Sequence, residues 1–346
     1  MSSPYLVELR DVDKTFYTRH FFSKNEETGR RPIYRKKTVH AVDRVSFGIR
    51  SGEIFGLLGR NGAGKTTTVK MISGLVKPCS GEVFVDDLPV EKKRLQVLRR
   101  IGVVLEGTRT CIWPLTPLEN LAYFGNLRDV KGKVLRERSH RLLDFIGLTD
   151  KKDIQVRRLS RGQKQKLAIC IALITDPPVL LLDEPTTGLD VQSSRAIKDK
   201  VIEMTREQGK CVLVTTHDMG TAQELCDRIG IIKDGALVAC KPTEELLGVF
   251  ADQRFEFRLD RAPNLETIQA LPGVMGVESI NSDGGPGFIL RTSADEAERS
   301  NALYNTLGQL QSQGLLLRTV TQRQQNLEGV FLQLTESQAD APKGRN

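Results

Sequence analysis

The stretch that decides the fold of this 346-residue chain is Gly59-Arg60-Asn61-Gly62-Ala63-Gly64-Lys65-Thr66. It matches the spacing G-x-x-x-x-G-K-[ST], between a predicted strand, Ile54 to Leu58, and a predicted helix, Thr67 to Ser73. The glycines let the backbone curl, so that successive N–H groups and a helix N-terminus point at one phosphate chain. Lys65 adds a positive charge there, and Thr66 supplies a hydroxyl for Mg²⁺. The stretch predicts that the chain binds and hydrolyses a magnesium nucleoside triphosphate, ATP, through Gly59, Arg60, Asn61, Gly62, Ala63, Gly64, Lys65, Thr66 and Thr67.

Short apolar runs predict the strands around this loop. They are Leu6–Leu9, Val45–Ile49, Ile54–Leu58, Gly102–Leu105, Val179–Leu182, Val212–Thr215 and Ile229–Ile232. From Ile54 onward most runs are continuously apolar rather than alternating, which is typical of parallel strands covered on both faces. Successive helical patterns from Thr116 to Ile174 predict a helical subdomain at about 113–175 that interrupts the sheet. The expected fold at 1–245 is therefore α/β, a P-loop NTPase core with a mainly parallel sheet.

The pattern changes after about Phe250, where strand, helix, two strands, helix and strand follow in order. The runs are 254–259, 265–271, 276–280, 287–291, 294–313 and 315–320. This order resembles a split βαβ sandwich, so we expect a small α+β domain at 250–335. Within 326–335 apolar residues at helical spacing predict an amphipathic helix with its apolar face packed inward. These residues are Leu327, Val330, Phe331 and Leu334, and a flexible polar tail is expected at 336–346.

Two carboxylates end the apolar run Val179–Leu182, namely Asp183 and Glu184. Ligands of open parallel sheets bind at the carboxyl edge of the strands, where both side chains are expected. Asp183 is suited to Mg²⁺, and Glu184 is suited to accept a proton from the attacking water. His217 follows another mostly apolar run and is expected at the same edge, where an imidazole can contact the γ-phosphate or orient the water.

The segment Leu159-Ser160-Arg161-Gly162-Gln163 opens a second predicted helix, with Ser160 as its N-cap. Such a helix end attracts anions, but the triphosphate of this chain is already bound by Gly59–Thr66. One interpretation is an ordinary capped helix. The other is a two-fold dimer in which Ser160 and Gly162 of one copy close over the γ-phosphate of the other.

The amino-acid composition limits which classes of protein the chain can belong to. Hydrophobic residues make up 39% and charged residues 27%, as in soluble globular proteins. The longest unbroken apolar stretch, Leu167–Ile174, is far shorter than the roughly 20 residues that cross a bilayer. The six cysteines lie at no metal or redox spacing, which favours reduced thiols in a cytosol. The net charge of +8 is concentrated at 18–40, which predicts either a mobile surface loop or a contact with a membrane surface or an acidic partner.

Taken together, five motifs in this order resemble the ATP-binding subunit of an ABC transporter over about residues 5–245. They are Gly59–Thr66, the signature segment Leu159–Gln163, Val179–Glu184, the dimer-bridging loop Gly188–Asp190 and His217. The resemblance implies ATP and Mg²⁺ as cofactors, a head-to-tail homodimer and two transmembrane permease subunits. It also implies a peripheral position on the cytoplasmic face of the cell membrane. Ser160, Gly162 and Gln163 would contact the nucleotide of the other copy across the dimer. Phe16 would stack on the adenine of the chain's own nucleotide, and Glu184 and His217 would serve catalysis.

The chain departs from the family at two positions. Arg161 stands where glycine is commonest, and Glu106 stands where a glutamine usually follows the strand. We expect Glu106, with Thr66 and Asp183, to be a metal ligand, although its charge can alter affinity and turnover. Tyr17 is the alternative for the residue that stacks on adenine, and a buried core phenylalanine is the other interpretation of Phe16. The segment Gly107–Thr116 is where the family receives a helix of its membrane partner.

The helix predicted at 326–335 resembles the closing motif of accessory domains on ATPases of drug, polyketide and ion exporters, which favours export. An alternative is a soluble ABC ATPase that acts on nucleic acid or the ribosome. Such proteins usually carry paired ATPase modules or long coiled coils, whereas this sequence has one phosphate loop and no sustained heptad pattern. A GTPase or a small-molecule kinase would not explain Leu159–Gln163.

Overall fold

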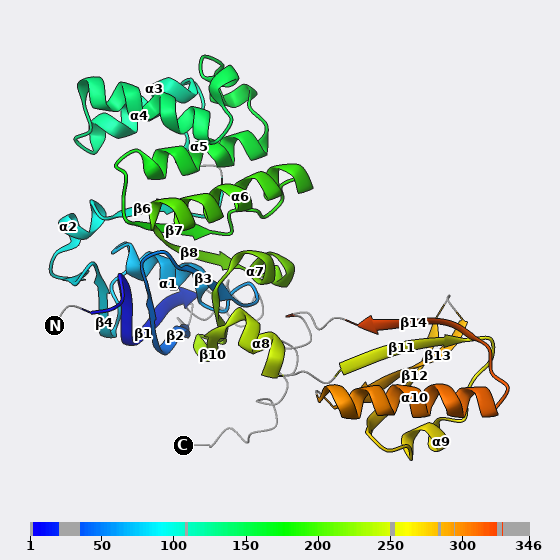
Figure 1. Cartoon of the computed structure of the whole chain (residues 1–346). Helices are drawn as coiled ribbons and strands as arrows, with labels where there is room; N and C mark the ends of the chain where they lie inside the picture. The colour runs from blue at the N-terminus through cyan, green and yellow to red at the C-terminus, as the bar shows by residue number, and fades with distance from the viewer. Residues whose placement is uncertain are drawn as a thin grey trace, which may run out of the picture. The chain divides into compact units, whose positions relative to one another are not determined.

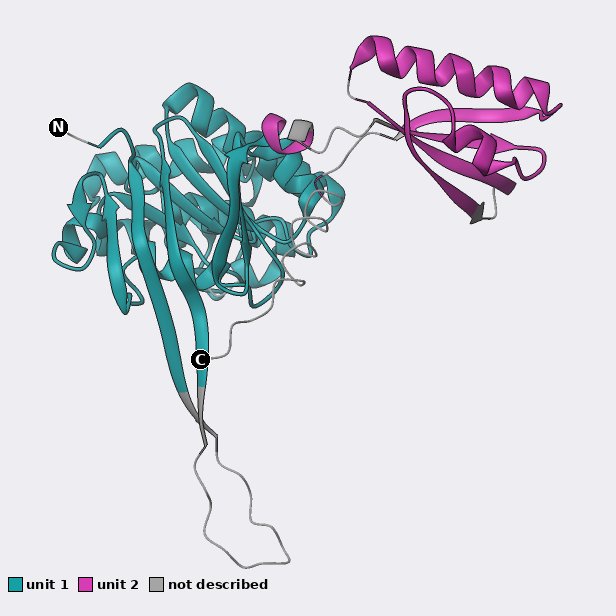
Figure 2. Ribbon diagram, turned by 90° about the horizontal axis from the view of Figure 1, so that it is seen from below, with its two compact units in different colours: residues 1–243 teal, residues 244–346 magenta. Residues whose placement is uncertain are grey.

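The computed structural model describes residues 3–20, 35–107, 110–249, 253–282, 285–293, 295–323 and 327. The chain forms two compact units, Met1–Thr243 and Glu244–Asn346 (Figure 2). The site predicted from the sequence lies in the first unit. No helix among the described residues is long and apolar enough to cross a bilayer.

A six-stranded sheet forms the centre of the first unit (Figure 1). Its strands, in spatial order, are β10 (Ala236–Pro242), β9 (Arg228–Lys233), β3 (Ile54–Leu58), β8 (Cys211–Thr216), β7 (Val179–Asp183) and β6 (Ile101–Val104). All neighbours are parallel except β10, which pairs antiparallel with β9. Every residue of β3, β7 and β8 is buried, as their unbroken apolar runs predicted. The α/β fold with a mainly parallel sheet is therefore confirmed.

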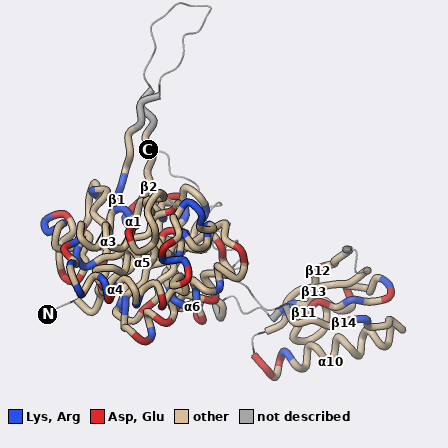
Figure 3. The backbone as a smooth tube through the Cα atoms, turned by 90° about the horizontal axis from the view of Figure 1, so that it is seen from above, with Lys and Arg blue, Asp and Glu red and all other residues tan. Residues whose placement is uncertain are grey.

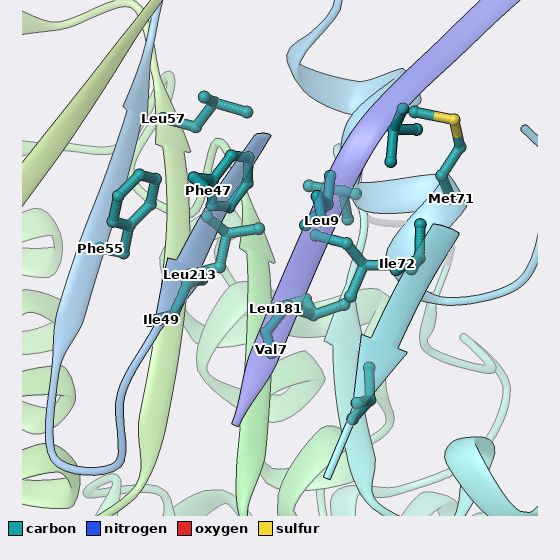
Figure 4. Close-up of a cluster of buried hydrophobic side chains, with 14 of the residues drawn as sticks. Val7, Leu9, Phe47, Ile49, Phe55, Leu57, Met71, Ile72, Leu181 and Leu213 are labelled. Carbon is teal, nitrogen blue, oxygen red and sulfur yellow. The ribbon is translucent and has the colours of Figure 1, made fainter. Parts of the chain in front are cut away.

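A second, antiparallel sheet covers part of this core. Its strands, in spatial order, are β2 (Arg35–Ile49), β1 (Val7–His20), β4 (Ser80–Val85) and β5 (Leu88–Pro89). Figure 4 shows its side chains meeting those of the parallel sheet in one apolar cluster. Within the cluster the rings of Phe47 and Phe55 stack with centroids 4.8 Å apart.

The expectation of a surface loop at 18–40 is wrong for its two ends. Residues 18–20 belong to β1 and residues 35–40 to β2, which pair antiparallel from Thr18↔Lys37 to His20↔Arg35. Residues 21–34 lie outside the described part of the chain. Backbone pairing between the two strands, rather than an apolar period, extends them beyond the runs predicted from the sequence.

The helices of the first unit cover the sheets and form the helical subdomain. They are α1 (Lys65–Ile72), α2 (Arg94–Leu98), α3 (Pro117–Leu127), α4 (Gly132–Phe145), α5 (Arg161–Leu173), α6 (Val191–Gln208) and α7 (Met219–Leu225). The next helix, α8 (Thr243–Val249), begins at the last residue of the first unit and continues into the second. Figure 1 shows α3, α4 and α5 packed together next to α6. Thr116 and Glu119 form a capping box at the start of α3, which Pro117 begins. The predicted insertion of helices into the sheet is confirmed.

After α8, the described part of the second unit forms a four-stranded antiparallel sheet and two further helices. The chain runs through β11 (Gln253–Leu259), α9 (Leu265–Gln269), β12 (Val274–Ser282), β13 (Gly285–Thr292), α10 (Glu296–Ser312) and β14 (Leu317–Arg323). The spatial order is β12-β13-β11-β14, the order of a split βαβ fold. Phe257 and Phe288 stack at 4.8 Å in its core. Leu327 is buried, but Val330, Phe331, Leu334 and the tail 336–346 lie outside the described residues.

Charged residues of both signs are intermixed along the two units (Figure 3).

Candidate active site

The glycine-rich loop joins the buried strand β3 to α1, and its backbone needs glycine. Gly62 and Gly64 have φ angles of 84° and 111°, which L residues rarely adopt. A Cβ atom on Gly64 would lie 2.3 Å from the carbonyl oxygen of Ala41 in β2. The loop therefore curls between the two sheets, with the N-terminus of α1 at its end.

Lys65 lies inside this curl and is buried. Its Nζ donates hydrogen bonds to the carbonyl oxygens of Gly59, at 2.8 Å, and Arg60, at 3.3 Å. The same Nζ lies 3.4 Å from Oε1 of Glu184. The side chain thus spans from its own loop to the end of β7, which brings the two predicted motifs together.

Asp183 is fully buried at the end of β7 and faces the loop. Its Oδ1 accepts hydrogen bonds from Thr66 Oγ1, at 3.2 Å, and Thr215 Oγ1, at 2.5 Å. Its Oδ2 is buried and has no hydrogen-bond partner among the described residues. A buried carboxylate oxygen without a partner is costly, and a hard cation is a natural partner for it. The arrangement fits a Mg²⁺ ion between Thr66 and Asp183.

Glu184 stands in a left-handed conformation with a φ of 52°. Such strain in a non-glycine residue costs about 1–3 kcal/mol and clusters at functional sites. Its Oε2 accepts a hydrogen bond of 2.6 Å from Thr187 Oγ1, and both carboxylate oxygens lie 3.0 Å from Nδ1 of His217. The structure therefore brings Glu184 and His217 into direct contact, as their places at the sheet edge predicted.

Ser160 caps α5 through a reciprocal capping box. Its Oγ accepts from the backbone N–H of Gln163, and the Gln163 side chain accepts from the Ser160 N–H. The predicted N-cap is present. Among the described residues, no hydrogen bond or ion pair joins Ser160, Gly162 or Gln163 to Gly59–Thr67 of the same chain. The capping box at Ser160 and the phosphate loop therefore share no direct bond within one copy.

Phe16 lies on β1 and is 37% exposed, so the alternative of a buried core phenylalanine is wrong. It pairs with Val39 of β2, two residues before Ala41, whose carbonyl touches the glycine loop. Phe16 therefore lies on the pair of strands that reaches the loop, and Lys14 Nζ is 5.1 Å from its ring centroid.

Glu106 is exposed after β6, and no hydrogen bond or ion pair between described residues joins it to Thr66 or Asp183. Among the described residues, Glu106 therefore does not join Thr66 and Asp183 in one cluster. Glu106 follows the strand that neighbours β7 in the sheet, which places it at the same edge as Asp183.

Two threonines of the site were not predicted from the sequence. Thr215 donates to Asp183, and Thr187 donates to Glu184. Threonine is also frequent in buried strands and turns, so neither residue carries a signal of its own. Asp190 caps α6 by accepting a hydrogen bond from the backbone N–H of Ser193. This bond stabilises the ionised carboxylate and lowers the pKa of Asp190.

A cleft of about 940 Å³ opens beside His217, between α6 and α7. Thr187, Gly188, Val191 and Lys198 also line it. Val191 is 87% exposed at the start of α6, which is unusual for a branched apolar side chain. The dimer-bridging loop expected at Gly188–Asp190 therefore borders an open cleft in the single chain.

Comparison with known proteins identifies the family. The family model described as "ABC transporter" matches residues 42–187. The Nod factor export ATP-binding protein I of Ralstonia nicotianae is 36% identical over 312 residues, which cover 89% of this chain and 92% of that protein. The linearmycin resistance ATP-binding protein LnrL of Bacillus subtilis is 31% identical over 303 residues, or 87% and 95% of the two chains.

A solved structure agrees with this similarity. It is the dimeric post-hydrolysis state of the ATP-binding cassette MJ0796 bound to ADP and Pi. It superimposes with a TM-score of 0.57 and 28% identity, covering 68% of this chain and 98% of that cassette. The chain therefore belongs to the ABC transporter family of ATP-binding proteins and is an ATPase.

Proposed function

We propose that two copies of this chain bind two ATP molecules between them and drive a membrane exporter. The observation that carries the proposal is that one chain builds two separate anion-binding helix ends. One end, at Gly59–Thr66, is joined to Asp183, Glu184 and His217, whereas the other, at Ser160, makes no bond to them. In a two-fold dimer the Ser160 end of each copy faces the nucleotide of the other.

The residues of the first end have distinct roles in hydrolysis. The loop amides and Lys65 bind the phosphates, and Phe16 stacks on the adenine. Glu184 accepts the proton of the attacking water, while His217 holds the Glu184 carboxylate and contacts the γ-phosphate. Thr66 and Asp183, with Glu106 at the same edge of the sheet, would hold Mg²⁺, which would offset the charge of the triphosphate.

The length of chain that matches an export protein favours export over import. The match to the Nod factor export protein spans 312 residues, more than the 243 residues of the first unit, so it includes part of the second. We infer that the second unit is an accessory domain of an exporter ATPase. The permease subunits hold the chain at the cytoplasmic face of the membrane, and the exposed Trp113 belongs to the surface that contacts them.

The dimer is tested by light scattering of the Glu184→Gln variant with ATP and Mg²⁺, where we expect an ATP-dependent dimer. Adding Ser160→Asp keeps a good N-cap but sets a negative charge against the partner's γ-phosphate, so it should prevent the dimer. Ser160→Asn keeps the cap without the charge and should leave the dimer intact. A Glu184→Gln chain that stays monomeric with ATP, even beside its co-purified permease, contradicts the proposal.

A further inference from the structure

Arg161, the residue that replaces the usual glycine, contacts the loop between β7 and α6. Its Nη2 donates a hydrogen bond of 3.0 Å to the carbonyl oxygen of Thr187. The guanidinium also occupies the space beside Gly188, where a Cβ atom would lie 2.4 Å from Nη1. Gly188 has a φ of 69°, so the absence of a side chain there serves both the turn and this contact.

Thr187 in turn contacts the catalytic carboxylate. Its Oγ1 donates a 2.6 Å hydrogen bond to Glu184 Oε2, and its backbone N–H donates to the Glu184 carbonyl at 3.3 Å. Two successive bonds therefore connect the guanidinium of Arg161 with Glu184. A second contact joins the same elements, because a Cβ atom on Gly162 would lie 2.5 Å from Oγ of Ser193 in α6.

The contact matters most once ATP is bound. Among the described residues Glu184 has three side-chain partners, Lys65, Thr187 and His217. A triphosphate in the loop draws Lys65 away, since a point charge there binds the phosphates. Thr187 and His217 then remain to hold the carboxylate. A displacement of a catalytic group by 1 Å can lower the rate by a large factor. The hydrogen bond from Arg161, which holds Thr187 in place, therefore supports hydrolysis.

We propose that Arg161 is a positioning residue for ATP hydrolysis, acting through Thr187 on Glu184 of its own chain. The inference rests on the proposed function, in which Glu184 accepts the proton of water. Because Arg161 directly follows Ser160, it ties the helix end that faces the partner's nucleotide to the proton acceptor of the chain's own site.

The test compares steady-state ATP hydrolysis by Arg161→Ala, Thr187→Val and the double variant. We expect kcat to fall about tenfold in each single variant, with KM for ATP within about twofold, because ground-state binding is untouched. The double variant should be no slower than the slower single one, since Arg161 has nothing to position once the Thr187 hydroxyl is gone. Arg161→Lys keeps a donor and should recover part of the lost rate.

Arg158→Ala is the matched control, because it removes an equally exposed arginine three residues earlier and should keep the rate of the unmodified chain. Unchanged kcat in Arg161→Ala, or multiplied losses in the double variant, would overturn the inference. So would a raised KM at constant kcat, which indicates contact with the partner's nucleotide. The Glu184→Gln variant distinguishes failure of the inference from failure of the proposed function. Hydrolysis that persists in Glu184→Gln would show that Glu184 is not the proton acceptor. Loss of hydrolysis in Glu184→Gln, together with a normal rate in Arg161→Ala, would remove only the role of Arg161.

Discussion

Nζ of Lys65 lies 3.4 Å from Oε1 of Glu184, and the two side chains are only 6% and 5% exposed. The cation proposed to bind phosphate therefore lies against the carboxylate proposed to activate water. Breaking such a buried pair leaves an uncompensated charge unless a new partner arrives. In the proposed function the triphosphate would be that partner for Lys65.

Glu184→Gln should bind ATP at least as tightly as the unmodified chain while losing turnover by about a hundredfold or more. The amide keeps the size of the side chain, but it no longer competes for Lys65 or accepts a proton. Titration with a fluorescent ATP analogue and a phosphate-release assay measure the two effects. Weaker binding in this variant would argue that the Lys65–Glu184 pair does not oppose the nucleotide.

Lys65→Ala is the opposite change and should weaken ATP binding at least tenfold. It removes the positive charge from the loop, whereas Glu184 keeps its contacts with Thr187 and His217. The same titration measures this loss. Unchanged ATP affinity would count against the assignment of the loop.

Asp183→Asn should raise the Mg²⁺ concentration for half-maximal hydrolysis at least tenfold. The substitution removes the charge of the buried Oδ2 atom, for which no described residue is a partner. Thr215→Val, in contrast, removes a donor to Asp183 and should lower the free energy of unfolding by about 1–3 kcal/mol. Hydrolysis at graded Mg²⁺ and denaturant unfolding distinguish the two. Equal Mg²⁺ dependence in Asp183→Asn and the unmodified chain would remove Asp183 as a metal ligand.

Phe16→Ala should raise KM for ATP about three- to tenfold, because stacking on a base contributes roughly 1 kcal/mol or more. Phe16→Trp should retain the affinity. Tyr17→Ala is the matched control, since Tyr17 is the adjacent exposed aromatic and pairs with Thr38. If Tyr17→Ala raises KM and Phe16→Ala does not, the stacking residue is Tyr17.

The thiols offer a test of the fold that needs no nucleotide. Burial raises the pKa of Cys111 to about 12 and also raises the pKa of Cys170, Cys211 and Cys226. Because the thiolate is the reactive form, alkylation of the native protein near pH 8 should modify the exposed Cys79 and spare these four. They should react once denaturant unfolds the chain. Mass spectrometry of the labelled peptides checks the order, and early labelling of Cys211 in β8 would contradict the buried sheet.

Local patterns were enough to predict the parallel core and the helix ends. The unbroken apolar runs of β3, β7 and β8 belong to strands buried on both faces, and the side chains of Ser160 and Gln163 cap α5 within four residues. The second sheet was harder to predict. β4 begins with three exposed residues, and its pairing with β1 joins positions about 70 residues apart, such as Arg10 and Glu82.

The sequence alone determined that the chain has a phosphate loop, two carboxylates at the edge of a parallel sheet and a capped helix beside them, because spacing and apolar runs are properties of neighbouring residues. Only the tertiary structure decided that Lys65 contacts Glu184, that Thr187 holds the same carboxylate, and that Arg161 reaches Thr187. The strand order of the sheet and the turn after β7 bring these residues together. Such contacts depend on the folded path of the whole first unit, and no short pattern of residues encodes them.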